Sequence, residues 1–169
     1  MMYGERMKET STVTIGPFTF YVDATPKGVS HLRISRKPLK KGESKNKIII
    51  QFMKEMVKFQ NGKKDAFRHL QLDTVGTAFQ AKVWEAVRKI PYGETRTYSQ
   101  IAAEVGSPRA VRAVGTALGK NPVCIVVPCH RVVPASGGIG QYALGKKVKQ
   151  WLLDHEAARN PAVKRVRKG

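Results

Sequence analysis

The sequence is short of cysteine and has no long apolar run. Two cysteines and four histidines are scattered through 169 residues, so neither a disulfide framework nor a four-ligand structural zinc site is expected. No apolar run approaches the ~20 residues that span a bilayer, and residues 1–14 lack the apolar core of a secretory signal. We therefore expect a protein without metal or membrane segment, located in the cytoplasm, or in the nucleus of a eukaryote.

Acidic residues are also scarce. Asp and Glu number 12 against 31 Lys and Arg, which leaves a net charge of +19. The excess of positive charge runs through the chain. Residues up to Val75 include fifteen basic and seven acidic residues, and those after it include sixteen basic and five acidic residues. Such a surface suits a polyanion, and nucleic acid is the commonest one in a cell. High charge also keeps proteins soluble, so the charge alone does not identify the partner.

The first part of the chain, residues 1–75, is predicted to be a small β-sheet with one helix. Short strands are expected within 13–34, where apolar residues alternate, and a helix over 48–59, where they keep helical spacing. Residues 36–47 are predicted to be a lysine-rich exposed loop, and 67–73 another strand or an extended linker. With 41% apolar residues, the chain can bury a core in one domain or two small ones.

The second part, residues 76–169, is predicted to be mostly helical. Capping boxes at 77–80 and 97–100, each Thr-x-x-Gln, mark two helix starts. Ser107 and the proline after it are expected to cap a third helix over 109–118. Two helices joined by a tight glycine turn in a basic chain predict a helix-turn-helix.

The helix over 109–118 is predicted to have two different sides. At ~100° per residue, Val111, Val114 and Leu118 fall on the core side. Small and basic residues make up the exposed side, namely Arg109, Arg112, Ala113 and Thr116. Small side chains let a helix approach a phosphate–sugar surface closely, and arginines contact it. An ordinary amphipathic helix with arginines in water fits the same pattern.

A reactive segment follows. The apolar run 123–127 is predicted to be a buried strand or extended core segment, and Cys129, His130 and Arg131 lie just beyond it. A thiol beside an imidazole and a cation has the form of an activated nucleophile. Neighbours on an extended chain point apart, so His130 needs a bent backbone or a bridging water to take the Cys129 proton. Cys124, within the run, fits an inert core cysteine.

The histidine also needs an orienting carboxylate. The last helix is expected to bury a stripe of apolar and aromatic residues, Val148, Trp151, Leu152 and His155. Glu156 lies at the edge of this stripe, whereas Asp154 points away, so Glu156 is the predicted partner of His130. The residues thus suggest a Cys-His-Glu nucleophile beside a DNA-binding helix.

At these residues the sequence resembles a known family. The motif Pro-Cys-His-Arg-Val at 128–132 is similar to the signature of the O6-alkylguanine-DNA alkyltransferases, also called methylated-DNA–protein-cysteine methyltransferases. Further segments resemble that family in order and spacing, at 76–84, 90–102, 109–115, 121–122 and 151–156. The resemblance implies an α+β fold, with a small RNase H-like sheet and helix in 1–75. A mostly helical alkyltransferase domain with a DNA-binding helix-turn-helix would then occupy 76–169.

The resemblance also implies roles in catalysis. Cys129 would accept the alkyl group, and His130, oriented by Glu156, would act on it as a base through a water. Tyr98 would donate a proton towards the purine as guanine leaves. Arg112 would enter the base stack in place of the flipped nucleotide.

Other residues would hold the DNA and the base. The remaining DNA contacts implied are Arg109, Ala113, Thr116, Thr95 and Ser107. The implied substrate pocket comprises Asn121, Val132, Tyr142 and Ala143, with Asn121 also tying the recognition helix to the active-site turn. Ala143 stands where the family often has serine, and Gln141 where it has asparagine. We expect the smaller Ala143 to admit bulkier alkyl groups.

The implied function is single-turnover DNA repair without a cofactor. A monomer would take an alkyl group from O6-alkylguanine in double-stranded DNA, with O4-alkylthymine as a second candidate substrate. Two alternatives remain. A lesion-sensing DNA-binding protein without transfer is disfavoured by the presence of Cys129, and a Cys-His-Glu hydrolase of acyl bonds by the helix-turn-helix.

Overall fold

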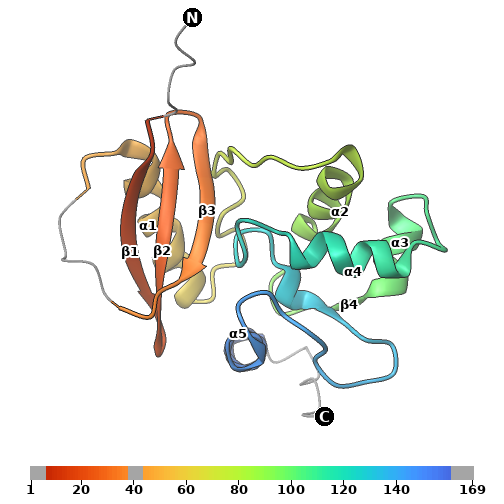
Figure 1. Cartoon of the computed structure of the whole chain (residues 1–169). Helices are drawn as coiled ribbons and strands as arrows, with labels where there is room; N and C mark the ends of the chain where they lie inside the picture. The colour runs from red at the N-terminus through yellow and green to blue at the C-terminus, as the bar shows by residue number, and fades with distance from the viewer. Residues whose placement is uncertain (1–6, 38–43, 161–169) are drawn as a thin grey trace, which may run out of the picture. The chain divides into compact units, whose positions relative to one another are not determined.

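The computed structural model describes residues 7–37 and 44–160 (Figure 1). Contacts within the chain divide it into two compact units, Met1–Val75 and Gly76–Gly169. No helix in the described ranges is long and apolar enough to cross a membrane.

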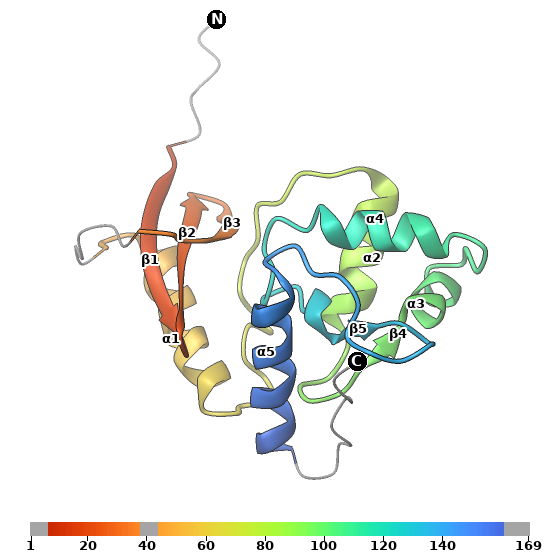
Figure 2. The same ribbon diagram turned by 60° about the horizontal axis from the view of Figure 1, so that its bottom comes forward.

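The first unit is a three-stranded antiparallel sheet with one helix. The strands are β1 (Glu9–Ile15), β2 (Phe18–Thr25) and β3 (Gly28–Ile34), in the order β1-β2-β3. Helix α1 (Lys47–Gln60) packs on one face of the sheet, as Figures 1 and 2 show. The fold class predicted for this part, a small sheet with a helix, is confirmed.

The loop and the linker of this unit differ in part from the prediction. Within 36–47, residues 38–43 lie outside the described ranges, and α1 begins at Lys47. Residues 67–69 lie in a turn, residues 70–73 form no regular strand, and one isolated bridge joins Leu72 to Val29. The strand alternative for 67–73 is therefore wrong, and the extended-linker alternative fits only the part after the turn, where Gln71 and Asp73 each form a backbone hydrogen bond with Val29.

The second unit is mostly helical. Its elements are α2 (Ala78–Arg88), β4 (Arg96–Thr97), α3 (Tyr98–Glu104), α4 (Val111–Gly119), the 3-10 turn η1 (Cys129–Arg131), β5 (Val132–Val133) and α5 (Lys146–Arg159). Strands β4 and β5 form a short parallel pair. Both predicted capping boxes are confirmed, because the Thr77–Gln80 and Thr97–Gln100 side chains each satisfy the other residue's backbone N–H.

Helices α3 and α4 form the predicted helix-turn-helix (Figure 2). Helix α4 packs against α2 and α3, and the Trp84 indole N–H donates to the Ala117 carbonyl at 2.8 Å. The predicted start of α4 was wrong. Ser107 does not cap it, because its carbonyl accepts from the Ala110 N–H in a separate turn and the helix begins at Val111.

The predicted core side of α4 needs one correction. Val114 and Leu118 are buried as expected, but Val111 is 37% exposed. Ala117 is buried in its place.

The apolar run 123–127 is a buried loop, not a strand. The Asn121 side chain accepts from the Val123 N–H at 3.0 Å and donates to the Val127 carbonyl at 2.9 Å, which holds the two ends together. The chain reverses between them, with Ile125 at a φ of 78°. Hydrogen bonds to one side chain, together with the bond from the Val127 N–H to the Val123 carbonyl at 3.0 Å, thus replace the ladder expected from apolar character.

The buried stripe of α5 also differs from the prediction. Val148 and Leu152 are buried as expected, but Trp151 and His155 are half-exposed and stack on each other at 4.6 Å between ring centroids. Lys149, Leu153 and Glu156 complete the buried face. Glu156 is therefore inside this face rather than at its edge.

Candidate active site

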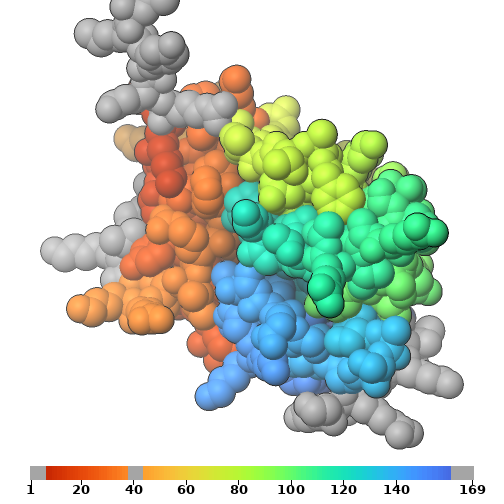
Figure 3. All heavy atoms as spheres, turned by 45° about the vertical axis from the view of Figure 1, so that its right-hand side comes forward, coloured from red at the N-terminus to blue at the C-terminus, as the bar shows by residue number. Residues whose placement is uncertain are grey.

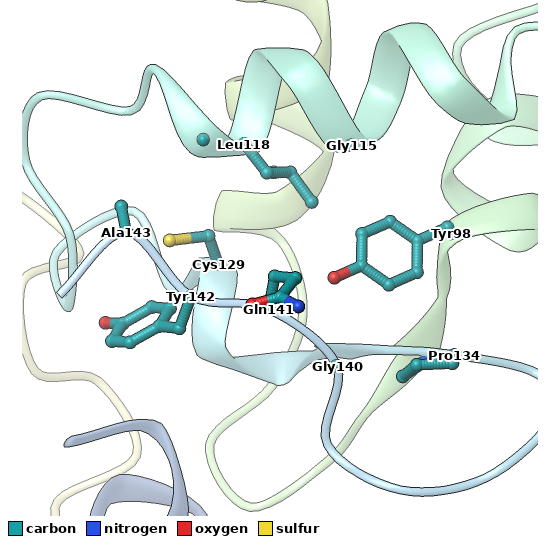
Figure 4. Close-up of a pocket in the computed structure, with 10 residues that line it drawn as sticks. Tyr98, Gly115, Leu118, Cys129, Pro134, Gly140, Gln141, Tyr142 and Ala143 are labelled. Atoms are coloured by element: carbon teal, nitrogen blue, oxygen red, sulfur yellow. The ribbon is translucent and has the colours of Figure 1, made fainter. Parts of the chain in front are cut away.

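Cys129 opens the turn η1, where the backbone bends sharply. The Arg131 N–H donates to the Pro128 carbonyl at 2.9 Å. This bend supplies the change of direction that an extended chain lacks, so successive side chains reach different surroundings. The Cys129 sulfur lies at the wall of a cavity (Figure 4), whereas His130 is fully buried.

The Cys129 sulfur contacts a side-chain amide and a second thiol. The Asn121 amide donates to it at 3.2 Å, and the Cys124 sulfur lies 3.6 Å away. The pKa of the Cys129 thiol is lowered first by the hydrogen bond with Cys124. Burial opposes this, while Asn121 and the charge of Lys149 lower the pKa further. The site therefore favours the thiolate, the nucleophilic form of cysteine.

His130 and Glu156 form the predicted pair, at 2.6 Å between Nε2 and Oε1. Burial raises the pKa of Glu156, but the charges and hydrogen bonds of His130 and Arg131 outweigh it and lower this pKa to about 2. An ionised carboxylate only accepts, so His130 Nε2 is the donor. Burial lowers the pKa of His130, so at neutral pH the ring is neutral and Nδ1 keeps its lone pair. Within the described residues, this buried Nδ1 has no hydrogen-bond partner.

Arg131 has a different position from the one the sequence suggested. Its guanidinium donates to both oxygens of Glu156, each at 2.9 Å, and to the Ile90 carbonyl at 2.7 Å. The Gly93 N–H also donates to Glu156 Oε2 at 2.9 Å. Arg131 therefore holds the carboxylate that orients His130, rather than lying beside the thiol.

Lys149 is a site residue that the sequence reasoning missed. It is buried, and its Nζ donates to the Val132 carbonyl at 2.7 Å and the Gln141 carbonyl at 3.1 Å. Burial lowers its pKa to about 8, against the opposing charge of Cys129. Its position seven residues before Glu156, on the same helix face, was the signal that could have found it.

The cavity beside Cys129 has a volume of about 500 Å³. Its walls are formed by Tyr98, Gly115, Leu118, Gly119, Cys129, Pro134, Gly140, Gln141, Tyr142 and Ala143 (Figure 4). Of the predicted pocket residues, Tyr142 and Ala143 line it, whereas Asn121 and Val132 do not. Asn121 instead binds the Cys129 sulfur, and Val132 is fully buried with its carbonyl bonded to Lys149. The cavity is thus built from α3, α4, η1 and the loop between β5 and α5.

Tyr98 places its hydroxyl in this cavity (Figure 4). Burial, and then the charge of Cys129, raise the pKa of Tyr98, so the phenol remains a proton donor at neutral pH. Gly140 lets the opposite loop pass close by, at a φ of 72°. A Cβ there would lie 3.0 Å from Pro134 ring carbons and 3.3 Å from the Tyr98 hydroxyl.

The predicted DNA contacts lie outside this cavity. Arg109, Arg112, Ala113 and Thr116 are exposed, and Thr95 and Ser107 are half-buried. On the surface of the second unit, α4 lies between α2 and the loop that leads to α5 (Figure 3). In the described ranges, no three His, Cys, Asp or Glu side chains gather where they could hold a metal ion.

The fold and the site define a helix-turn-helix protein with an activated cysteine. Residues 78–158 match the family model described as the 6-O-methylguanine DNA methyltransferase DNA-binding domain. A probable methylated-DNA–protein-cysteine methyltransferase of Acanthamoeba polyphaga mimivirus is 49% identical over 113 residues, 67% of this chain and 75% of that protein. The methylated-DNA–protein-cysteine methyltransferase of Mycobacterium bovis is 53% identical over 93 residues, which are 55% of this chain and 56% of that protein.

Two solved structures that are similar to this chain in fold belong to the same family as these sequence relatives. The crystal structure of the Mycobacterium tuberculosis O6-methylguanine methyltransferase superposes with a TM-score of 0.79 at 34% identity, covering 92% of this chain and 96% of that one. The crystal structure of the same Mycobacterium tuberculosis protein in complex with DNA superposes with a TM-score of 0.77, covering 90% of this chain and 95% of that one. The chain belongs to the methylated-DNA–protein-cysteine methyltransferase family. It is a DNA-binding repair enzyme that transfers an alkyl group from DNA to a cysteine of its own.

Proposed function

We propose that Cys129 is the acceptor and that O6-alkylguanine in double-stranded DNA is the donor. The observation that carries this proposal is the Cys129 sulfur itself, which faces a cavity of about 500 Å³ while the Asn121 amide donates to it. O4-alkylthymine is a second candidate donor. Ala143 lines the cavity, and its missing hydroxyl leaves room for alkyl groups larger than methyl.

The proton of Cys129 moves first. His130 Nδ1 takes it through a bridging water, since Nε2 is occupied by its bond to Glu156. Glu156 stabilises the imidazolium that forms, and Arg131 keeps the carboxylate in place.

The thiolate then attacks the alkyl carbon attached to the guanine O6 in one displacement. The S–C bond forms as the C–O bond breaks, and its electron pair moves to the purine. Tyr98 donates a proton towards the purine, which makes guanine a better leaving group. The product is a thioether on Cys129, and the described site has no group positioned to hydrolyse a C–S bond.

DNA would bind along α4, with Arg112 entering the base stack and Arg109, Ala113, Thr116, Thr95 and Ser107 nearby. Every residue of the proposed chemistry belongs to 76–169, so this part is the proposed alkyltransferase domain. The site is complete within one chain, and we propose a monomer that works where the DNA is, in the cytoplasm or a eukaryotic nucleus.

Repair should be stoichiometric. We expect at most one alkyl group removed per protein molecule, because the thioether has no exit route. The test incubates the protein with duplex DNA containing O6-methylguanine and measures the adduct by peptide mass spectrometry. An adduct on Cys129 at one per chain supports the proposal. Continued removal with protein limiting, or DNA binding without an adduct, contradicts it.

Arg112→Ala should separate base flipping from chemistry. Arg112 is exposed, so its loss should barely change folding stability. Extruding a base costs a few kcal/mol, which an inserted side chain partly offsets. Repair of duplex DNA should slow by ~10- to 100-fold, in line with a loss of ~1.4–2.8 kcal/mol, whereas reaction with free O6-benzylguanine should hardly change.

Single-turnover rates on both substrates check this expectation. Lys82→Ala removes an exposed positive charge from α2 and is the matched control, which should not slow duplex repair to the same extent. Equal slowing of the free base and the duplex by Arg112→Ala would place Arg112 in the pocket rather than on the DNA.

A further inference from the structure

The two cysteines of the chain meet in the interior of the second unit. Cys124 is 1% exposed and Cys129 4% exposed, and their sulfur atoms lie 3.6 Å apart. No other cysteine exists in the sequence. Alkyl transfer as proposed above uses one sulfur as acceptor, so the second thiol beside it has no assigned chemistry.

The surroundings of the two sulfurs differ. Cys129 lines the cavity, whereas Cys124 is not among the residues of its wall. The Cys124 sulfur contacts the Asn121 carbonyl at 3.5 Å, and the Asn121 amide donates to Cys129. A small oxidant that enters the cavity therefore meets Cys129 first, in the form that reacts with peroxides. Cys124 is positioned behind it as the second thiol.

The backbone between the cysteines allows them to approach. Residues 123–127 form a loop outside the regular helices and strands, with an isolated bridge between Cys124 and Val127. A disulfide requires the sulfurs to move from 3.6 Å to ~2.05 Å. A disulfide would displace the Asn121 amide from the Cys129 sulfur.

We propose that Cys129 and Cys124 are a hydroperoxide-reactive thiol pair that closes to a reversible disulfide. The Cys129 thiolate attacks one oxygen of the peroxide, the O–O bond breaks, and hydroxide, or alkoxide from an alkyl hydroperoxide, leaves. Cys129 is then a sulfenic acid. The Cys124 sulfur attacks the Cys129 sulfur, the S–O bond breaks and water leaves. Two thiols are oxidised by two electrons and one peroxide is reduced.

The disulfide has two consequences. It removes the alkyl acceptor until a dithiol reduces it, a consequence that rests on the proposed function of Cys129. It also diverts the sulfenic acid from further oxidation to sulfinic acid, which dithiols do not reverse. Disulfide formation itself does not depend on the proposed function.

The test treats the full-length protein with hydrogen peroxide in the absence of DNA. Free thiols are then blocked under denaturing conditions, and peptides are identified by mass spectrometry. In parallel, the alkyl-accepting capacity towards O6-methylguanine DNA is measured before and after dithiothreitol. We expect a Cys124–Cys129 disulfide within one chain, a parallel loss of capacity, and near-complete recovery of both by dithiothreitol.

Two variants test which of the two cysteines reacts with the peroxide first. In Cys124→Ser, Cys129 should proceed to sulfinic acid and most of the capacity should not return with dithiothreitol. In Cys129→Ser, the remaining Cys124 should resist the same peroxide dose. Capacity is scored as the final number of adducts per chain, so a slower variant does not disturb the reading. Cys124→Ala serves as a second variant if the serine disturbs folding, which circular dichroism reports.

The outcomes are distinguishable. Sulfinic acid on wild-type Cys129 at the same dose as in Cys124→Ser, or a disulfide only between two chains, overturns the proposal. A disulfide that forms without loss of alkyl-accepting capacity supports the thiol pair and instead overturns Cys129 as the acceptor.

Discussion

Cys129→Ala is expected to abolish alkyl transfer while DNA binding is retained. Cys129 is the one residue lining the cavity with a thiol, and its pKa is lowered by its hydrogen bonds. Cys124 does not replace it, because the hydrogen bond with Cys129 and burial raise the pKa of Cys124 well above its ordinary value. Without Cys129 that hydrogen bond is lost, but burial still disfavours the thiolate.

The measurement combines adduct mass with DNA affinity. No alkylated peptide should appear after incubation with O6-methylguanine DNA, and fluorescence anisotropy should show binding close to that of the wild type. Cys129→Ser preserves the shape of the site and should give the same result, because a serine hydroxyl stays protonated at neutral pH. Stoichiometric transfer to Cys124 or to any other residue in either variant would contradict the proposed role of Cys129.

Glu156→Gln is expected to reduce both stability and rate. The Glu156 carboxylate is buried and accepts hydrogen bonds from His130, Arg131 and the Gly93 N–H. A neutral amide leaves the Arg131 charge unpaired in the interior, which costs about 3–5 kcal/mol of unfolding free energy. The amide also no longer fixes which ring nitrogen of His130 carries the proton. General base catalysis, which contributes roughly 10²–10⁴ in rate, is therefore impaired.

The rate loss should be the same for free O6-benzylguanine and for duplex DNA. Glu156→Gln affects formation of the Cys129 thiolate, whereas Arg112→Ala affects base flipping. Asp154→Asn makes the same change of charge on a partly exposed side chain of α5 and is the control. Unchanged reaction with the free base in a folded Glu156→Gln variant would remove His130 from the chemistry.

The pH dependence of stability gives a second signature. The pKa of Glu156 falls from an ordinary 4.5 to about 2 on folding. A carboxyl with a lowered pKa stabilises the fold fully above 4.5, and this contribution is lost as the pH falls towards 2. Denaturant unfolding followed by circular dichroism should show a steeper loss of stability in this window for the wild type than for Glu156→Gln.

Features that depend on near neighbours were predictable from the sequence. The capping boxes at Thr77 and Thr97 involve partners three residues away, and the helical spacing before Phe59 repeats within single turns. The Pro-Cys-His-Arg motif is likewise contiguous. Backbone hydrogen bonding and side-chain period act over this range, so the helices and the helix-turn-helix could be inferred without coordinates. The pairing of His130 with Glu156, 26 residues apart, was inferred for a different reason, because a catalytic histidine needs an orienting carboxylate and the second part of the sequence has few carboxylates.

Features that depend on contacts between distant residues could not be inferred. The apolar run 123–127 gave no sign that Asn121 would close it into a loop, and nothing local to Arg131 says that it turns to Glu156, 25 residues away. In a low-dielectric interior a charged group takes the partner that packing brings within reach. The same packing buries Lys149 and brings the sulfurs of Cys124 and Cys129 to 3.6 Å. The proposed nucleophile, Cys129, could be named from the sequence, but its electrostatic surroundings arise from the fold.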